Sequence, residues 1–314
     1  MCNDPLFFES MMVDDTDHLL RVDQILSKYN PRFSRSQIQS WIKQGYVWVD
    51  HTPTTKPSLK INKGQTIVIR APLEPVLVDQ PQAIELTIAY EDAQLLMINK
   101  PSGMVVHPGA GNRDYTLLNG LLAYHPPLNK LPRAGIVHRL DKDTTGLMMV
   151  AKTHESYQYL VAKLAQRCIK REYLAICDGI VKQSQTVDQP ISRHPVHRQR
   201  MAVTPHGKEA ITHIQIKQRL NPFTLITCQL ETGRTHQIRV HCAHIGHPLL
   251  GDPTYGRPKS YQQLPPPLAA VVKAFPRQAL HAARLSLPHP EHGRLLTVTC
   301  PLPEDMMRLK NLLS

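Results

Sequence analysis

Residues 135–151 read GIVHRLDKDTTGLMMVA, an apolar segment, a polar one and a second apolar one. This pattern predicts two strands, at 135–140 and 147–151, joined by a polar turn. Asp141 comes where the first predicted strand ends, a place where a rigid scaffold can present a side chain to a ligand. The alternative is an Asx turn, in which its carboxylate accepts hydrogen bonds only from nearby backbone N–H groups.

Further strands and helices are predicted on both sides of this stretch. The other strand candidates are residues 95–99, 172–177, 212–216 and 224–229. Helical patterns occupy 156–167 and 235–245, and Gly246 ends the second of them. Several strands follow one another with only short turns between them. We therefore expect a mixed sheet in an α+β domain rather than a strictly alternating parallel sheet.

The composition favours a folded protein with an anionic partner. At about 150 residues per domain, 314 residues predict about two domains, and 41% hydrophobic residues can build their cores. There are 37 Lys or Arg against 25 Asp or Glu, and this net charge of +12 favours nucleic acid over a membrane surface. No apolar run approaches the ~18 residues of a membrane span, and the six cysteines form no CxxC pair. These features predict a cytoplasmic protein without a membrane partner.

Charge is unevenly distributed and suggests domain boundaries. Residues 1–18 hold five acids and no Lys or Arg, which predicts an acidic, flexible tail. Residues 19–72 hold nine Lys or Arg against two Asp, as expected of a small RNA-binding domain. Prolines at 72, 75 and 81 predict a linker over 73–83, which leaves 84–314 for a larger domain.

The small domain is predicted to contain two helices followed by two short strands, at 46–49 and 66–69. Apolar residues spaced three and four apart indicate the first helix, and Ser34 or Ser36 can cap the second. The outward basic positions are Arg32, Arg35, Lys43, Lys56, Lys60 and Lys63. Basic side chains along one surface suit a phosphate backbone, although a solvated polar face would show the same pattern.

Two more segments of the larger domain could carry chemistry. Tyr173 begins a predicted strand and could face a ligand, although tyrosines on strands more often serve packing. Arg234 follows a glycine and precedes a predicted helix, where it could hold an anion or a carboxylate. The alternative for Arg234 is a surface arginine without a specific partner.

A metal site is not expected. His241, His244 and His247 are spaced by three, but no acidic or cysteine pattern completes a ligand set beyond Cys242. Gly246 is also expected to end the helix before His247.

Three longer strings are similar to those of a known family. HRLDKDTTGLMMVAK (138–152), REYLA (171–175) and TGRTHQIRVHCAHIGHPLLGDPTYG (232–256) resemble, in that order, the RluA/RluD family of pseudouridine synthases. Residues 19–70 resemble the S4 RNA-binding domain. HPGAGN (107–112) and TLLNGLL (116–122) look most like the branch that modifies helix 69, a hairpin loop of the large ribosomal RNA.

The resemblance implies a catalytic domain with a central cleft in a mixed sheet. It implies conversion of uridine to pseudouridine by an ionised aspartate, which is Asp141 here, without a cofactor. Arg234 would be the cation beside this aspartate, and Tyr173 would stack on the target base. Arg139 would fill the space that the flipped base leaves, and Leu140 would be an apolar wall of the site, with Leu230 and Ile238.

The implied partner is large-subunit ribosomal RNA or a precursor of the 50S particle. A monomer is expected, because nothing in the sequence suggests an obligate dimer. The basic stretch around Arg193, Arg198 and Arg200 could grip the RNA backbone, or it could be a solvated loop. Three functions remain open. They are a synthase of this branch, a sister-branch synthase acting on other uridines of the same RNA, and an RNA-binding assembly factor without turnover.

Overall fold

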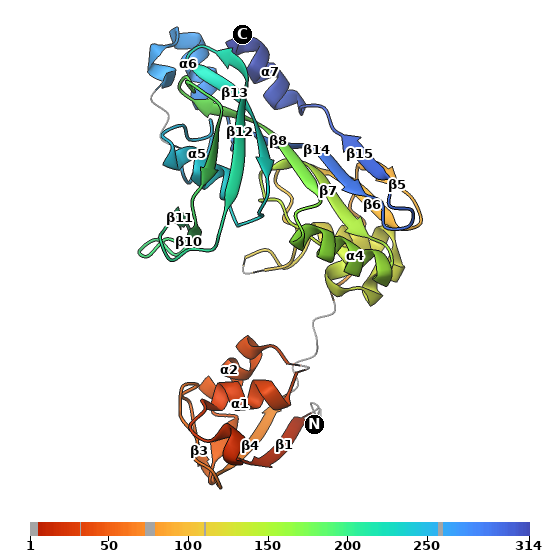
Figure 1. Cartoon of the computed structure of the whole chain (residues 1–314), viewed down its shortest axis with the longest axis vertical. Coiled ribbons are helices and arrows are strands. Elements are labelled where there is room, and N and C mark those ends of the chain that lie inside the picture. Colours follow the sequence, from red (N-terminus) through yellow and green to blue (C-terminus); the bar gives the residue numbers. More distant parts are fainter. Residues whose placement is uncertain (1–5, 32, 73–78, 110, 257–259) are drawn as a thin grey trace. The chain divides into compact units, whose positions relative to one another are not determined.

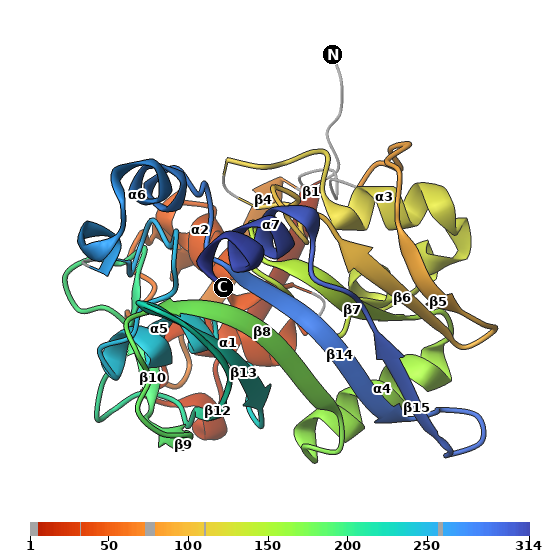
Figure 2. The same ribbon diagram turned by 90° about the horizontal axis from the view of Figure 1, so that it is seen from above.

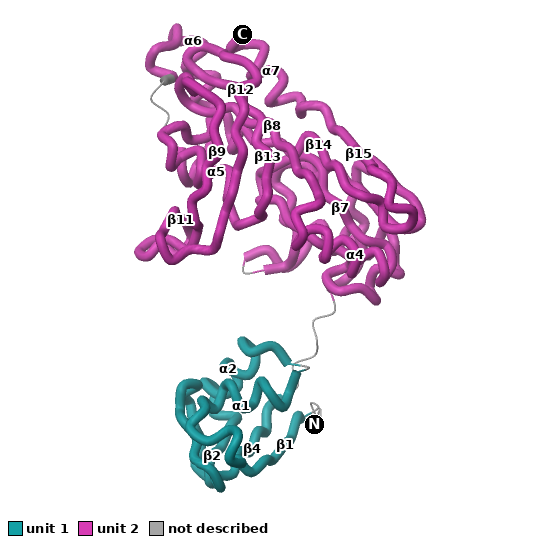
Figure 3. Tube along the Cα trace, in the orientation of Figure 1, with its two compact units in different colours: residues 1–78 teal, residues 79–314 magenta. Residues whose placement is uncertain are grey.

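The computed structural model describes residues 6–31, 33–72, 79–109, 111–256 and 260–314. They form two compact units, residues 1–78 and 79–314 (Figure 3). The boundary between the units falls inside the predicted linker of 73–83. Of that linker, 73–78 lie outside the described residues, whereas Gln80 and Gln82 hydrogen-bond Asn119 of the large unit.

The small unit has the two helices and the strands that its sequence predicts. Helices α1 (Val22–Tyr29) and α2 (Arg35–Lys43) accompany a four-stranded sheet. The sheet order is β1 (Leu6–Met12), β4 (Thr66–Pro72), β2 (Val47–Val49) and β3 (Thr52–Pro53). The Ser34 hydroxyl caps α2 by accepting a hydrogen bond from the N–H of Gln37.

The prediction of a flexible tail over 1–18 is wrong for the described residues 6–18. Strand β1 pairs antiparallel with β4 along its whole length, from Leu6 opposite Pro72 to Met12 opposite Thr66. Phe7 is buried, and its ring lies 4.9 Å from that of Phe33. The expectation rested on the five acids of this segment, but the apolar residues between them form an edge strand.

The large unit is built on one nine-stranded mixed sheet (Figures 1 and 2). Its order is β5 (Ile88–Glu91), β6 (Leu95–Lys100), β7 (Thr145–Ala151), β14 (Leu280–Pro288), β8 (Lys170–Asp178), β13 (Phe223–Leu230), β12 (Ile211–Leu220) and β9 (Gln185–Asp188), with β15 (Leu295–Thr299) paired to β14. Among the described strand pairs of this sheet, only that of β7 and β14 is parallel. The expected α+β class with a mixed sheet is confirmed.

Helices cover both faces of this sheet, because strand residues alternate between the faces. Leu96 and Ile98 share a core with α3 (Leu117–Tyr124) and α5 (Gln237–His244). Leu95 and Met97 point the other way and share a core with α4 (His154–Ala165). Helices α6 (Pro266–Lys273) and α7 (Glu304–Leu313) share a core with Phe223 and Leu225 at the start of β13. No helix in the described ranges is long and apolar enough to cross a membrane.

The predicted strand at 135–140 is absent, whereas the one at 147–151 lies inside β7. Gly135 has a φ of +77°, and a Cβ there would come within 2.1 Å of the Ala151 carbonyl oxygen. The N–H of Met149 in β7 donates to the imidazole Nε2 of His138, 3.0 Å away. A side chain thus occupies the strand edge where a backbone ladder would form, and 137–144 runs as an irregular segment.

Candidate active site

A cavity of about 840 Å³ opens in the large unit beside the irregular segment that carries Asp141. Its walls come from that segment, from β8, from the end of β13 and from the start of α5. All three residues expected to be catalytic, Asp141, Tyr173 and Arg234, line it, as do Arg139 and Leu140. The cavity therefore gathers the motifs that lie far apart along the chain.

Asp141 points toward α5 rather than back into its own turn. Its Oδ2 accepts a hydrogen bond from Nη1 of Arg239 at 2.9 Å, and its Oδ1 lies 3.9 Å from Nε2 of His236. The side chain is 17% exposed, so it is sheltered but still reachable from the cavity. This geometry favours a functional carboxylate over an Asx turn.

Arg239 is the cation beside Asp141, and the expectation that Arg234 holds this position is wrong. Nε of Arg234 donates to the carbonyl oxygen of Glu209 at 2.9 Å, and its side chain is exposed. Arg234 precedes α5 and is exposed at the cavity, whereas Arg239 lies in the first turn of that helix and is buried.

A second carboxylate fixes Arg239. Its Nε and Nη2 donate to the two oxygens of Asp252 at 2.7 and 2.9 Å, which leaves Nη1 for Asp141. Burial alone would lower the pKa of Arg239, but the carboxylates of Asp252 and Asp141 outweigh it and raise that pKa. Burial would raise the pKa of Asp252, and Arg239 instead holds it below its ordinary value. Both groups are therefore charged at neutral pH.

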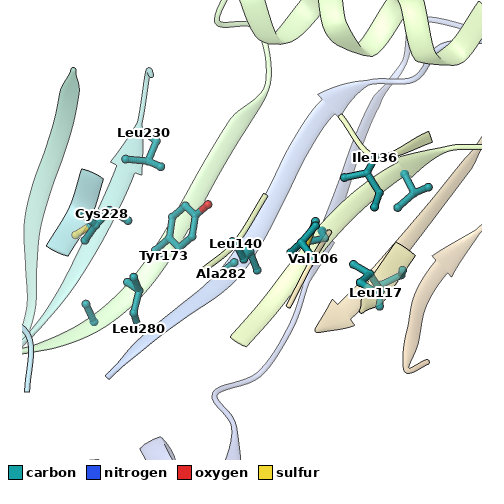
Figure 4. Close-up of a cluster of buried hydrophobic side chains, with 14 of the residues drawn as sticks. Val106, Leu117, Ile136, Leu140, Tyr173, Cys228, Leu230, Leu280 and Ala282 are labelled. Carbon is teal, nitrogen blue, oxygen red and sulfur yellow. The ribbon is translucent and has the colours of Figure 1, made fainter. Parts of the chain in front are cut away.

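Tyr173 projects from β8 into the apolar side of the cavity. It lies opposite Cys228 of β13 on one side and Ala282 of β14 on the other. Figure 4 shows it in a buried cluster with Leu140, Leu230 and Leu280. Burial raises the pKa of Tyr173, so the phenol is neutral at physiological pH. Leu140, Leu230 and Ile238 all line the cavity.

His236 and Tyr255 complete the surroundings of Asp141, and sequence reasoning missed both. The N–H of Met201 donates to the Tyr255 oxygen, which leaves the phenolic hydrogen for Nδ1 of His236, 2.8 Å away. Burial lowers the pKa of His236 although the Asp141 carboxylate opposes it. When the Tyr255 hydroxyl donates to Nδ1, the ring hydrogen of a neutral His236 is on Nε2, the nitrogen that faces Asp141.

Lys100 supports the turn that carries Asp141 from inside the protein. Its ammonium is buried and donates to the carbonyl oxygen of Lys142 at 2.8 Å and to two carbonyl oxygens of its own loop. Burial lowers the pKa of Lys100 to about 8, against the opposing effect of the Asp143 and Asp141 carboxylates.

The other expected RNA contacts lie outside the cavity. Arg193, Arg198 and Arg200 are exposed on the hairpin of β10 (Ile191–Arg193) and β11 (Met201–Val203). In the small unit, Arg35 and Lys43 are exposed on α2, and Arg35 pairs with the buried Asp23 at 3.0 Å. Arg32 lies outside the described residues.

The three histidines spaced by three do not converge on a common point. Both ring nitrogens of His241 are used, one with Thr212 and one with the carbonyl oxygen of Gln189, each at 2.9 Å. Nδ1 of His247 donates to the carbonyl oxygen of Asp178. Within the described ranges, no three His, Cys, Asp or Glu side chains form a group that could hold a metal ion.

The sequence also held a signal for Arg239 and Asp252. Arg239 lies between Ile238 and Val240 in a predicted helix, and Asp252 directly follows Leu249-Leu250-Gly251, so both charges have apolar neighbours. A charge at such a position is rarely buried without a partner. Two opposite charges of this kind in one motif predict an ion pair.

The chain is similar to known proteins along most of its length. A family model described as RNA pseudouridylate synthase matches residues 94–244, and the S4 domain model matches 20–67. A curated protein named ribosomal large subunit pseudouridine synthase D, from Haemophilus ducreyi, is 50% identical over 92% of this chain and 89% of its own. The protein of that name from Escherichia coli K12 is 49% identical over the same shares.

Solved structures share the fold over about three quarters of the chain. Human RNA Pseudouridylate Synthase Domain Containing 4 is 26% identical, with a TM-score of 0.58 over 72% of this chain and 92% of its own. Human RNA Pseudouridylate Synthase Domain Containing 1 is 25% identical, with a TM-score of 0.53 over 73% of this chain and 86% of its own. The chain therefore belongs to the family of RNA pseudouridylate synthases, an isomerase family, and carries an S4 domain ahead of its synthase domain.

Proposed function

We propose that this protein converts uridine to pseudouridine in large-subunit ribosomal RNA, in the loop of helix 69, with Asp141 as the catalytic carboxylate. The observation that carries the proposal is the bond from Nη1 of Arg239 to Asp141, which holds a carboxylate at the cavity wall beside Tyr173. The curated relatives that match 92% of the chain are named for the large ribosomal subunit.

The reaction breaks the N1–C1′ bond of uridine, turns the base and joins C1′ to C5. The hydrogen on C5 leaves as a proton and N1 gains one, so the atoms balance without an oxidant, a reductant or an energy source. We therefore propose that no cofactor takes part. A reaction of this kind needs an ionised carboxylate near the sugar and the base, and Arg239 favours the ionised form of Asp141 by charge and by a hydrogen bond.

The target base must leave its stack to reach Asp141. Extrusion costs a few kcal/mol and costs less in an unpaired loop, which favours a hairpin loop as the substrate. A cavity of about 840 Å³ lies in the range of ~300–1,000 Å³ that ligand sites occupy. The ring of Tyr173 gives the base a surface for stacking, and the exposed Arg139 can occupy the space that the base leaves.

The rest of the RNA would be held by exposed cations outside the cavity. The hairpin with Arg193, Arg198 and Arg200 and helix α2 with Arg35 and Lys43 offer such contacts to phosphates. We propose free ribosomal RNA or a precursor of the 50S particle as the partner, and a monomeric, cytoplasmic protein.

Tritium release from RNA made with 5-tritiated uridine tests the reaction directly, because joining C1′ to C5 expels the hydrogen on C5. We expect release by the wild type and none by Asp141→Asn, with similar RNA binding by both proteins. Mapping of the pseudouridines should place them in the helix 69 loop.

Two results would contradict the proposal in different ways. Pseudouridines elsewhere in the same RNA would indicate a sister-branch synthase. Tight binding without release, on unmodified RNA in its assembly context, would indicate an assembly factor.

A further inference from the structure

Three arginines are buried in the described part of the chain, and their partners differ. Arg171, Arg239 and Arg277 are 7%, 5% and 3% exposed. Arg239 binds the carboxylates of Asp252 and Asp141, and Arg277 donates two bonds to Asp305 at 2.7 and 2.8 Å. Among the described residues, no carboxylate lies within ion-pair distance of Arg171.

The hydrogen bonds of Arg171 leave most of its guanidinium unused. Nη2 donates to the carbonyl oxygen of Glu231 at 3.1 Å, and Nε has no partner among the described residues. The carboxylate of Glu231 is engaged elsewhere, with Arg167 at 2.7 Å and His213 at 2.8 Å. A guanidinium has five N–H donors, and Arg171 uses one of them here.

Arg171 also faces the active-site cavity. It precedes Tyr173 by two residues on β8, and residues two apart on a strand point to the same face. Both side chains line the cavity. At the neighbouring Gly233, a Cβ would come 2.7 Å from Nη1 of Arg171, so the absence of a side chain at 233 leaves room for this group.

Burying a charge without a counter-charge is unfavourable, and proteins rarely do so without a functional reason. Burial lowers the pKa of Arg171, but a guanidinium stays protonated at physiological pH. The cavity itself supplies little compensation, because Asp141 is paired with Arg239 and Glu231 with Arg167. The missing counter-charge must therefore come with the ligand.

We propose that Arg171 binds a phosphodiester group of the RNA nucleotide that enters the cavity, and so fixes the sugar relative to Asp141. This inference rests on the proposed RNA substrate. Phosphodiesters are the only anions that RNA brings, one for each nucleotide. The guanidinium fork donates two parallel hydrogen bonds to phosphate oxygens, which a lysine cannot reproduce.

Neutral backbone analogues test the contact from the RNA side. A hairpin containing the target uridine is made with one methylphosphonate, placed in turn at each of the phosphodiesters flanking that uridine, as separated Rp and Sp diastereomers. Binding is measured by fluorescence anisotropy for the wild type, Arg171→Lys and Arg171→Gln. Arg284→Gln serves as the control, because Arg284 is an exposed arginine on the adjacent strand β14 that does not line the cavity.

We expect one methylphosphonate position to weaken wild-type binding about tenfold or more, as loss of a charged hydrogen bond should. Arg171→Gln should lose about the same factor on normal RNA and little further on that analogue. Arg171→Lys should fall between the two, and Arg284→Gln should behave as the wild type.

The proposal is overturned if, at every methylphosphonate position, the fold loss in binding of Arg171→Gln on the analogue equals the product of the two separate losses, as it does for independent contacts. It is also overturned if no position weakens wild-type binding, a result that does not depend on any variant's folding. Tritium release from normal RNA is scored separately. Absence of release by the wild type would refute the proposed function. The comparison of wild-type and variant binding to normal and methylphosphonate RNA would still decide whether Arg171 contacts a phosphate.

Discussion

Asp141, Arg239 and Asp252 form a short chain of alternating charges in which each member orients the next. Asp252 takes two of the arginine's donors and accepts the backbone N–H groups of Thr254 and Tyr255, so its own position is fixed by a turn. Because these two bonds fix the orientation of the guanidinium, Nη1 points to one place, and the Asp141 carboxylate lies there. The geometry of the carboxylate at the cavity wall thus depends on a residue outside the cavity.

Exchanging Asp252 for Asn should impair both stability and turnover. The change leaves Arg239 buried without its main counter-charge, which typically costs about 3–5 kcal/mol in the free energy of unfolding. A small displacement of Asp141 should lower kcat at least about tenfold. Urea unfolding and tritium release at saturating RNA measure the two effects. Asp92→Asn is the control, because Asp92 binds Tyr90 and His289 away from the cavity and should not change kcat.

The imidazole of His138 makes the stability of the large unit sensitive to acid. Burial lowers the pKa of His138 to about 3, from an ordinary value of 6.5. The unfolded chain then binds a proton below about pH 6.5 that the folded chain excludes, so the free energy of unfolding falls as the pH falls from 6.5 toward 3.

His138→Gln should flatten this acid dependence, because an amide oxygen can still accept the N–H of Met149 but does not titrate. The expected difference is at most about 1.4 kcal/mol per pH unit, read from urea unfolding between pH 7 and 5. His154→Gln, an exchange at an exposed histidine, should leave the slope unchanged. Equal slopes for wild type and His138→Gln would show that another group controls the acid response.

At the scale of elements, strand β1 is an integral part of the small unit. Phe7 points inward and its ring lies 6.0 Å from that of Trp41, whereas the next residue, Phe8, is 64% exposed. Pairing with β4 accounts for the backbone of β1, and Phe7 anchors its inner face.

Phe7→Ala should destabilise the small unit by about 3–5 kcal/mol, as loss of a buried aromatic ring does. Phe8→Ala should stay within about 0.5 kcal/mol, because its side chain is exposed. Both tryptophans of the chain, Trp41 and Trp48, lie in this unit, so their fluorescence reports its urea unfolding alone. Similar midpoints for the two variants would mean that β1 is not anchored through Phe7.

The sequence predicted the helices with a clear periodic pattern and the strands that are short apolar runs. The periodic helices at 156–167 and 235–245 match α4 and α5, and the five confirmed strands are short apolar runs inside β6, β7, β8, β12 and β13. Strand β14 was missed although it lies in the middle of the sheet. Its parallel pairing with β7 joins residues more than 130 positions apart, and such pairing leaves no local pattern.

In the active site too, the sequence predicted what lies within one motif and missed what depends on the fold. Asp141, Tyr173 and Arg139 could be found because each lies in a motif string, and the structure brings all three to one cavity. The apolar neighbours of Arg239 favour it over Arg234 in the sequence, but which of the two is buried beside Asp141 depends on where α5 begins. The helix starts at Gln237, after His236 adopts a left-handed φ of +57°, and this turn directs Arg239 inward.

At the scale of the whole molecule, the two units contribute differently to the charge. Residues 1–78 hold nine Lys or Arg and eight Asp or Glu, whereas residues 79–314 hold 28 and 17. Nearly all of the net charge of +12 thus belongs to the large unit. The small unit can hold RNA through local contacts, such as Lys43, but it adds little to the long-range attraction.

A chain of residues 79–314 should therefore keep the chemistry and lose part of the binding. Every residue that lines the cavity belongs to the large unit, so kcat on saturating RNA should stay within about threefold. KM should rise about tenfold or more, because contacts made equally in the ground state and the transition state are lost. Steady-state tritium release measures both constants, and circular dichroism checks the fold. A collapse of kcat in a folded chain would show instead that the S4 domain helps to complete the active site, and an unchanged KM would show that it takes no part in holding this RNA.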